Sequence, residues 1–401
     1  MKILTFTTLF PNAVQHHHGI FTETTLKHQL ATREISATVV APVPWFPSTN
    51  PRFGRYGSFA RIPLTEQRVG VDVHHPRYFL PPKMGMHIAP FMLAKAALPV
   101  MKKIAATDGF DVIDAHYFYP DGVAAVLLGM YFRKPVIISA LGTDINLIPK
   151  FPLARAMIKW AGRRSAAMIT VCAALKREMV DLGMEADKIF PLRNGVDLQL
   201  FHPVDKAAAR QALGIDGFTL LSVGHLDPRK GHDRIIGALR HLPGVKLIVI
   251  GGGAGRQKLA ALASAEGVHD RVTFIAPIAQ AALRDYYSAC DALVLASSRE
   301  GWANVLLEAM ACGTPVVASN VWGTPEVVQS PAAGVLLDEN SPRGIAAGVE
   351  RLRSQYPTRA ATRAYAETFG WGATTAGQLR LFRQAIHPSL QPAPQPGMDS
   401  A

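Results

Sequence analysis

Residues 298–319 read Ser-Arg-Glu-Gly-Trp-Ala-Asn-Val-Leu-Leu-Glu-Ala-Met-Ala-Cys-Gly-Thr-Pro-Val-Val-Ala-Ser, and they decide the fold of the second half of the chain. The pattern predicts a short apolar helix that begins near Asn304, ends at Gly313 and precedes a buried strand at 315–318. Glu300 lies in the loop before this helix, and Glu308 lies about one turn inside it. The stretch therefore combines a strand-loop-helix unit with two carboxylates near the helix start.

This arrangement is suited to a nucleotide. The free backbone N–H groups of a helix start favour an anion such as phosphate. The carboxylate of Glu308 can accept hydrogen bonds from two vicinal hydroxyls of a ribose. The alternative interpretation is that two solvated glutamates flank an alanine-rich helix.

Length and composition indicate the class of protein. A chain of 401 residues predicts two domains, since one hydrophobic core rarely grows past about 250–300 residues. The sequence contains no uncharged apolar run of about 18 residues, and its start is too short for a signal peptide. We therefore expect a cytoplasmic protein. The widely spaced cysteines predict buried thiols rather than a metal site: Cys172, Cys290 and Cys312.

The net charge of +12 bears on partners. It fits anionic substrates, an anionic membrane surface or nucleic acid. Nucleic acid is the least favoured, because the sequence shows no basic stripe interleaved with aromatic residues and no recognition module. A peripheral position at the inner face of a membrane stays open.

Buried strands alternate with helices in the first half, which predicts a parallel, doubly wound sheet. The strands are expected at 2–8, 38–41, 111–116, 135–140, 167–171 and 189–192. The loop 9–19 contains three adjacent histidines, for which we favour solvent exposure over a metal site. Gly19, at the entrance of a helix over 20–33, allows backbone to approach a ligand closely.

Two further features of this half point to function. His116 ends a strand, where a crevice is expected, although a lone histidine here is more often structural. Residues 42–82 are rich in proline, aromatic and basic residues and predict a long functional loop region with a short strand near 71–74.

The helix over 153–164 is amphipathic at about 100° per residue. Leu153, Met157, Trp160 and Ala161 share its apolar face, with Ile158 at the edge. The basic opposite face fits docking on an anionic membrane. An ordinary surface helix with its apolar side on the core is the favoured interpretation.

The second half repeats the alternation. Strands are expected at 219–223, 246–250, 272–275, 292–295 and 315–318. Lys230 follows the first of them and can hold a diphosphate as a point charge, unless it is simply solvated. The glycine run 251–255 does not fit the pattern G-x-G-x-x-G, and no acidic residue ends the next strand, so a dinucleotide site is not supported.

We therefore predict a first domain at 1–197 and a second at 206–370. A final helix is expected at about 371–387, and the proline-rich tail 388–401 is predicted to be disordered.

Together these motifs resemble the retaining glycosyltransferases of family 4. The resemblance rests on the two glutamates at E-x7-E spacing, on Cys-Gly-Thr-Pro-Val-Val-Ala-Ser at 312–319, on Asn-Gly-Val-Asp at 194–197 and on the loop 224–231. The sequences of residues 300–308 and 322–326 are most similar to the branch of the family associated with surface polysaccharides such as teichuronic acid. The likeness implies the GT-B fold, in which two doubly wound domains face a cleft and the C-terminal helix crosses back to the first.

The resemblance also implies the roles of individual residues. It implies a nucleotide-diphosphate sugar donor, with UDP favoured, on the second domain, and a saccharide or lipid-linked acceptor on the first. Lys230 matches the diphosphate lysine, Glu308 the ribose glutamate, and Glu300 the glutamate that reaches the hydroxyls of the donor sugar. On the first domain, His116 matches the histidine beside the sugar, and Gly19 the flexible glycine near the phosphates. Further substrate-binding residues would be Asn194, His225, Arg229, Trp302, Ala303, Asn304 and Val305.

The sequence departs from the family at three places. His225 stands where the family often has arginine, and the neighbouring Arg229 is a candidate substitute. Trp302-Ala303 replaces the usual Phe-Gly pair, which narrows the pocket and changes the donor that is accepted. Ala276 replaces a glycine after the third strand of this domain.

The implied reaction needs no metal or cofactor, since the nucleotide sugar is itself a substrate. Lys230 and the helix start would stabilise the leaving diphosphate. We find no convincing covalent nucleophile and expect same-face attack by the acceptor hydroxyl, with retention at the anomeric carbon. A sugar-nucleotide epimerase with the same architecture and a non-catalytic sugar-nucleotide-binding protein are the alternatives.

Overall fold

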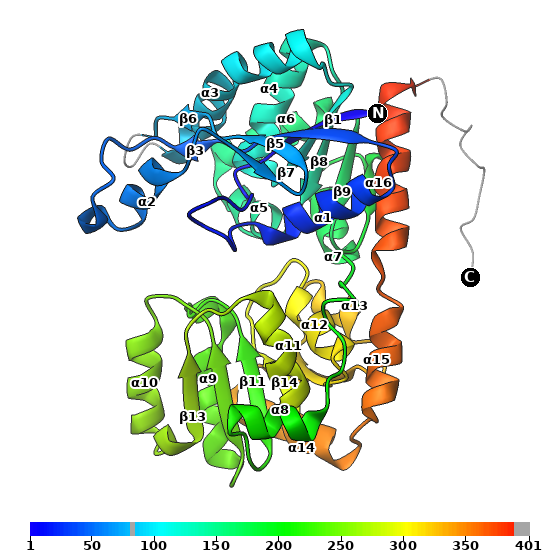
Figure 1. The fold of residues 1–401 in the computed structure, drawn as a ribbon. Coiled ribbons are helices and arrows are strands. Elements are labelled where there is room, and N and C mark those ends of the chain that lie inside the picture. Colours follow the sequence, from blue (N-terminus) through cyan, green and yellow to red (C-terminus); the bar gives the residue numbers. More distant parts are fainter. Residues whose placement is uncertain (81–84, 389–401) are drawn as a thin grey trace, which may run out of the picture. The chain divides into compact units, whose positions relative to one another are not determined.

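The computed structural model describes residues 1–80 and 85–388 (Figure 1). The chain forms two compact units. Unit 1 comprises residues 1–171 and 175–192 together with the chain from Ala373 onward, and unit 2 comprises residues 172–174 and 193–372. Each unit is a largely parallel β-sheet with helices on both faces, so the predicted α/β class with two doubly wound Rossmann-like units is confirmed.

Unit 1 is built on a sheet in the order β10-β9-β8-β7-β1-β2-β5-β4. Its central strands are runs of valine, isoleucine and alanine that are buried on both faces, as parallel strands require. The strands are β1 (Lys2–Phe6), β2 (Ser36–Val40), β4 (Thr65–Arg68), β5 (Val71–His74), β7 (Val112–His116), β8 (Val136–Ala140), β9 (Ala167–Thr170) and β10 (Ile189–Pro191). A separate parallel pair joins β3 (Val43–Pro44) to β6 (Arg77–Tyr78).

Helices cover both faces of this sheet. On one face, Leu379 and Phe382 of the C-terminal helix join a buried cluster with Ile3 and Val112. On the other face, Gly129 lets a helix approach Val136 closely. The helices are α1 (Ile20–Ala31), α2 (Arg55–Arg61), α3 (Gly85–Thr107), α4 (Val123–Phe132), α5 (Thr143–Asn146), α6 (Pro152–Arg164), α7 (Ala173–Asp181) and α16 (Trp371–Ile386).

Unit 2 contains a six-stranded parallel sheet in the order β13-β12-β11-β14-β15-β16. The strands are β11 (Thr219–Val223), β12 (Lys246–Ile250), β13 (Val272–Ile275), β14 (Ala292–Leu295), β15 (Val316–Ser319) and β16 (Gly334–Leu337). The helices are α8 (Lys206–Leu213), α9 (His232–Ala238), α10 (Arg256–Ala265), α11 (Gln280–Ala289), α12 (Asn304–Ala311), α13 (Thr324–Val327), α14 (Pro342–Ser354) and α15 (Arg359–Glu367). The order reverses between β11 and β14, where ligands of such sheets bind.

Several elements differ from the predictions. The short strand predicted near 71–74 is confirmed as β5, but the predicted loop region 42–82 also contains β3, α2, β4 and β6. β4 pairs antiparallel with β5 at the sheet edge. The last two positions of the region, 81 and 82, lie outside the described residues. The long helix α3 has no counterpart in the predictions, because Pro90 and Pro99 lie inside it and prolines normally end helices. β16 is also additional; it begins with glycine and is a mostly half-buried strand at the edge of the sheet.

The prediction for the helix over 153–164 placed the wrong residues at the centre of its apolar face. In α6, Ala154, Ile158 and Ala161 are buried, whereas Leu153 is 50% exposed. Ile158, which we placed at the edge, is therefore the centre of the buried face. Because that face is used in the core of unit 1, α6 is an ordinary surface helix.

The three cysteines are free and buried, as predicted. Within residues 1–80 and 85–388, none of the helices is both long and apolar enough to cross a bilayer. The tail predicted to be disordered lies, beyond Pro388, outside the described residues.

Candidate functional site

The switch point of unit 2 carries an ion pair. Lys230 follows β11 and Glu300 follows β14, so the two side chains come from the carboxyl ends of adjacent strands. Their Nζ and Oε1 atoms lie 2.5 Å apart, and both side chains are largely buried. Ser297 donates a hydrogen bond of 2.6 Å to the same oxygen of Glu300. The sequence prediction named both charged residues, and the structure brings them together.

Gly231 fixes the close approach of the two loops that carry this pair. Its φ is +71°, and a Cβ placed there would lie 2.1 Å from the carbonyl oxygen of Ala296. A residue with a side chain would therefore clash with backbone in a conformation that already disfavours L-residues. The glycine lets the end of the β11 loop lie directly against the end of β14.

Glu308 lies on α12, buried in unit 2. Tyr287 of α11 donates a hydrogen bond of 2.8 Å to its Oε2. Burial raises the pKa of Glu308 to about 7, and the Tyr287 hydrogen bond acts in the opposite direction. A carboxyl group with a pKa near neutrality can respond to a ligand that donates hydrogen bonds to it.

The loop between the glutamates is also buried. Trp302 and Ala303 precede α12, which begins at Asn304 as predicted, and Val305 lies in its first turn. The Trp302 ring lies 6.3 Å from the ring of Phe369. Its Nε1 and the Oδ1 of Asn304 are buried and have no hydrogen-bond partner among residues 1–80 and 85–388. A buried polar atom without a partner is costly, so these two atoms are candidates to contact a ligand.

The loop after β11 contains His225, which stands where the family often has arginine, and Arg229, the candidate substitute for that arginine. His225 is exposed, and its carbonyl oxygen accepts a hydrogen bond from Nε2 of the buried His232. The Arg229 guanidinium lies 3.8 Å from Glu300 and 3.6 Å from Asp227. Arg229 therefore lies beside the Lys230–Glu300 pair, where a substitute for the family arginine would be needed.

Asn194 lies in unit 2, in the segment that follows β10. Next to it, a Cβ on Gly195 would lie 2.7 Å from the backbone nitrogen of Trp371. The segment is therefore packed closely on the chain at the start of α16, and the role of Asn194 in binding stays a prediction.

Unit 1 has its own switch point, between β1 and β7. His116 ends β7 and is buried, and its Nε2 lies 3.0 Å from Oδ2 of Asp114. The two residues are separated by one position on the strand, which places their side chains on the same face of the sheet. Asp114 thus orients the imidazole ring that we predicted as a sugar contact.

Gly19 precedes α1 with a φ of +69°. A Cβ on it would lie 2.2 Å from the carbonyl carbon and oxygen of Leu9. The glycine is therefore required by the packing of its own loop, in addition to any approach of a ligand. In the same loop His16, His17 and His18 are exposed, as expected.

Two buried carboxylates hold loops of unit 1, Asp121 the loop after β1 and Asp144 the chain after β7 and β8. Oδ1 of Asp121 accepts a hydrogen bond from the backbone N–H of Thr8, and its Oδ2 accepts one from the hydroxyl of Thr8. Asp144 accepts a bond of 2.7 Å from the N–H of Phe118 and another from the N–H of Gly142. Burial raises the pKa of Asp121 to about 7 and that of Asp144 to about 6.

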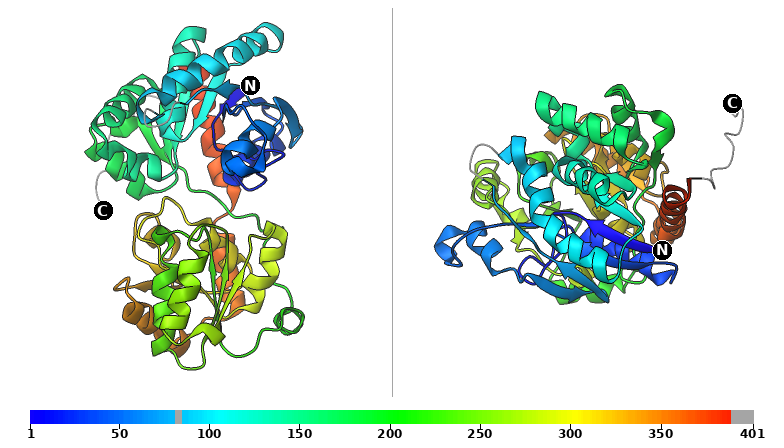
Figure 2. Two further views of the ribbon diagram at one scale, coloured as in Figure 1. Left: turned by 90° about the vertical axis from the view of Figure 1, so that its left-hand side faces the viewer. Right: turned by 90° about the horizontal axis from the view of Figure 1, so that it is seen from above.

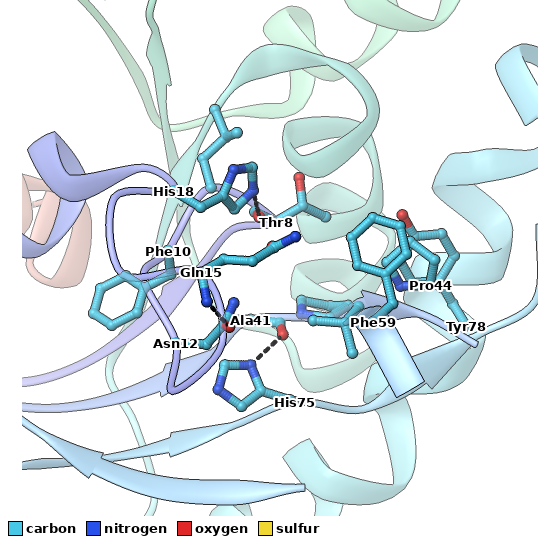
Figure 3. A pocket seen from close by; sticks show the side chains of 13 residues that line it. Thr8, Phe10, Asn12, Gln15, His18, Ala41, Pro44, Phe59, His75 and Tyr78 are labelled. Carbon is cyan, nitrogen blue, oxygen red and sulfur yellow. Dashed lines mark hydrogen bonds between the residues drawn. The ribbon is translucent and has the colours of Figure 1, made fainter. Parts of the chain in front are cut away.

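A pocket of about 280 Å³ opens beside this loop in unit 1 (Figure 3). Figure 3 shows His18, Gln15 and Asn12 on one side and Phe59 and Tyr78 on the other. The pocket therefore offers polar groups opposite an aromatic wall, a lining that suits a small polar molecule with an apolar face.

Sequence reasoning missed four supporting residues: Tyr287, Ser297, Asp114 and Asp121. Asp114 carried a usable signal, because an aspartate two positions before a strand-ending histidine shares its face. Asp121 also carried one in the sequence Tyr-Pro-Asp-Gly. Tyr287 gave none, since its partner Glu308 lies on another helix. Ser297 lies only three residues before its partner Glu300, but a serine in a loop has no pattern that indicates this bond.

Comparisons with known proteins identify the family. The family described as Glycosyltransferase Family 4 matches residues 21–200, and that described as Glycosyl transferases group 1 matches residues 205–369. A D-inositol 3-phosphate glycosyltransferase from Xylanimonas cellulosilytica is 31% identical and covers 83% of this chain and 86% of its own length. One from Acidothermus cellulolyticus, also 31% identical, covers 76% of this chain and 73% of its own length.

Solved structures share the fold. Sucrose-phosphate synthase from Thermosynechococcus elongatus matches with a TM-score of 0.78 and 22% identity, over 96% of this chain and 98% of its own. Anabaena HepE in complex with UDP matches with a TM-score of 0.73 and 22% identity, over 96% of this chain and 100% of its own. With both halves matched in order, the chain belongs to the glycosyltransferases of the GT-B fold that join a Family 4 region to a group 1 region.

Proposed function

We propose that this glycosyltransferase moves a hexose-type sugar from a UDP donor to a hydroxyl acceptor with retention of anomeric configuration. The observation that carries the proposal is the Lys230–Glu300 pair at the switch point of unit 2, with the buried Glu308 on the helix that follows. A cation, a helix start and two carboxylates match the diphosphate, ribose and sugar parts of one donor.

Each group has a distinct part in binding. Lys230 has three N–H donors, so it can keep its bond to Glu300 and offer another to a diphosphate oxygen. Oε2 of Glu308 is bonded to Tyr287, and its Oε1 is the oxygen we assign to the ribose. Glu300 is assigned to the hydroxyls of the donor sugar, with the N–H groups at the start of α12 supporting sugar and phosphate.

The chemistry follows from where charge develops. Breaking the bond between the anomeric carbon and the phosphate oxygen leaves negative charge on the diphosphate and positive charge on the sugar ring. Lys230 and the start of α12 stabilise the negative charge. The acceptor hydroxyl attacks on the face that the phosphate leaves, and the leaving phosphate takes its proton. His116, held by Asp114, is assigned to the donor sugar.

The acceptor is assigned to unit 1, at the pocket beside the β1 loop. The curated relatives are named D-inositol 3-phosphate glycosyltransferases, which supports a phosphorylated polyol as the first acceptor to test. The sequences of residues 300–308 and 322–326 support a second acceptor to test, one used in surface polysaccharide or glycolipid synthesis at the inner face of the membrane.

A panel of nucleotide sugars, scored by thermal shift, tests the donor. We expect UDP-sugars to raise the melting temperature more than ADP- or GDP-sugars do. Acceptors are then compared with the best donor, and the anomeric configuration of the product is read by NMR. An inverted product contradicts the mechanism, and conversion of the donor without acceptor would indicate an epimerase. If Glu300→Gln leaves turnover unchanged, the assigned site is wrong.

A further inference from the structure

An arm of unit 1 carries exposed aromatic side chains. We define the aromatic arm as residues 43–64, which contain β3 and α2, together with residues 77–80 around β6. In Figure 1 and in the right-hand view of Figure 2, α2 and its flanking loops extend away from the sheet of unit 1. Trp45, Tyr56 and Phe79 are 49%, 55% and 57% exposed. Exposed aromatic groups of this size mark an interaction surface.

The rings of the arm form two groups in contact, one around Trp45 and one around Phe46. Trp45 lies 6.2 Å from Phe79, and Phe46 lies 5.2 Å from Phe53 and 5.6 Å from Tyr56. The guanidinium of Arg52 lies 4.8 Å above the ring of Phe53. Within each group the rings therefore pack on one another, and Arg52 places a cation at the edge of the second group.

The charge of the arm is of one sign. No acidic residue occurs between Glu34 and Glu66, although this stretch contains Arg52, Arg55 and Arg61. The chain from Val73 to Thr107 is likewise without acidic residues. An interface with another protein usually gains specificity from charges of both signs. A surface of arginine, tryptophan and tyrosine without carboxylates complements anionic lipid headgroups instead.

We propose that the aromatic arm docks unit 1 on an anionic membrane surface, with Trp45, Tyr56 and Phe79 entering the headgroup layer and Arg52 and Arg61 contacting lipid phosphates. This proposal does not rest on the assigned donor, acceptor or mechanism. It assigns membrane contact to the arm in place of α6, whose apolar face is buried.

The arm also borders the pocket of unit 1. Phe59 and Tyr78 belong to the arm and form the aromatic wall of that pocket. A docked arm would therefore place the pocket near the headgroup layer, where the polar end of a lipid-linked molecule is found.

Vesicle sedimentation with the full chain tests the proposal. Vesicles of phosphatidylcholine alone are compared with vesicles that contain phosphatidylglycerol, at low and high salt. We expect binding to the anionic vesicles only, weakened by salt. Arg52→Gln with Arg61→Gln should reduce binding by roughly tenfold or more, since each arginine near an anionic surface contributes about fivefold.

A triple and a double variant separate the arm from α6. Trp45→Ser, Tyr56→Ser and Phe79→Ser together should abolish most binding. The matched control is Phe151→Ser with Leu153→Ser at the start of α6, whose side chains are 45% and 50% exposed, and it should bind like the natural chain. Far-UV circular dichroism and the thermal shift with UDP-glucose verify that each variant is folded, and vesicle binding is scored separately from that shift.

Tryptophan fluorescence gives a second readout. Brominated lipids should quench part of the emission, and Trp45→Phe should remove the quenched part while the other four tryptophans stay unquenched. The proposal is overturned if the natural chain does not bind anionic vesicles at low salt. It is equally overturned if the α6 variant loses binding while the arm variant keeps it, or if the arm mediates self-association instead.

Discussion

If Glu308 binds the donor ribose as proposed, it should couple donor binding to pH. In the free protein its pKa is about 7, because burial disfavours the charged form. Two ribose hydroxyls that donate hydrogen bonds favour the carboxylate, so binding releases a proton wherever the group is protonated beforehand. From a pKa of about 7, the ionised fraction changes about tenfold between pH 8 and 6, and the Kd of a UDP-sugar should rise by about the same factor as the pH falls.

Isothermal titration calorimetry with UDP-glucose measures this linkage. A sugar diphosphate diester is the right probe, because it lacks the phosphate monoester that titrates near pH 6. Below pH 7, titrations in buffers of different ionisation enthalpy should show the release of nearly one proton per donor bound. Tyr287→Phe removes the hydrogen bond that lowers the pKa of Glu308, so the transition should move to higher pH.

Glu308→Gln is the decisive control. It should bind the donor more weakly and without the pH dependence attributed to Glu308. Equal pH dependence in Glu308→Gln and the natural protein would refute the reasoning, because another group would then be titrating. His232 lies in the same unit, and burial lowers its pKa below the ordinary value of 6.5, so its titration would add a dependence only towards the acid end of this range.

The raised pKa of Glu308 also predicts how the stability of the protein changes with pH. Folding raises the pKa of Glu308 from an ordinary value of 4.5 to about 7, a difference worth about 3 kcal/mol. Because the folded state holds the proton more tightly, this contribution is fully present below pH 4.5 and is lost as the pH rises through 7. Glu308→Gln, which cannot ionise, should therefore be more stable than the natural protein at pH 8, by up to about 3 kcal/mol in urea unfolding.

Three further predictions concern the Lys230–Glu300 pair, the loop at Gly19 and the His116–Asp114 pair. Lys230→Met leaves Glu300 buried without its cation and should lower the free energy of unfolding by about 3 kcal/mol. The double variant Lys230→Met with Glu300→Gln should recover most of that stability but no transferase activity. Urea unfolding measures the stability and a product assay the activity, and recovery of activity would contradict the assignment. Gly19→Ala combines a left-handed backbone with a clash against Leu9. It should destabilise unit 1 by well over the roughly 1 kcal/mol expected of the control Gly109→Ala, whose φ is +68° but whose Cβ position is open. Equal changes in melting temperature for the two variants would refute the packing role. His116→Ala should lower kcat by roughly 100-fold and Asp114→Asn by less. A kcat that is insensitive to both changes would remove His116 from the reaction.

The strands of unit 2 could be predicted closely because each is a short, continuous apolar run. β11, β12, β13 and β14 occupy the predicted residues, and β15 is shifted by one position. Parallel strands are buried on both faces, so their signal depends only on local hydrophobicity. The residues between β2 and β7 of unit 1 do not behave in this way. There, prolines lie inside α3, and the short elements around α2 have little core to bury.

The charged residues of the candidate site could be predicted for a related reason. Lys230 and Glu300 each follow a buried strand, and parallel strands deliver the residues after them to one edge. What could not be predicted is which charges are paired and which carboxyl groups lose their solvent. The pKa of Glu308 depends on burial by α11 and α12, and this packing is not encoded in the residues adjacent to Glu308.

The two switch points differ in charge, and this difference supports the proposed place of the diphosphate. At the switch point of unit 2, Lys230 and Arg229 stand against Glu300. At that of unit 1, Asp121 and Asp144 lie so near each other that the charge of Asp144 contributes to raising the pKa of Asp121. A diphosphate beside these carboxyl groups would force further protonation at a cost in free energy. The backbone at Gly19 offers neutral N–H groups, so we expect the charge of the donor to be balanced in unit 2. In the proposed function, unit 1 then contacts the donor sugar through His116 and binds the acceptor.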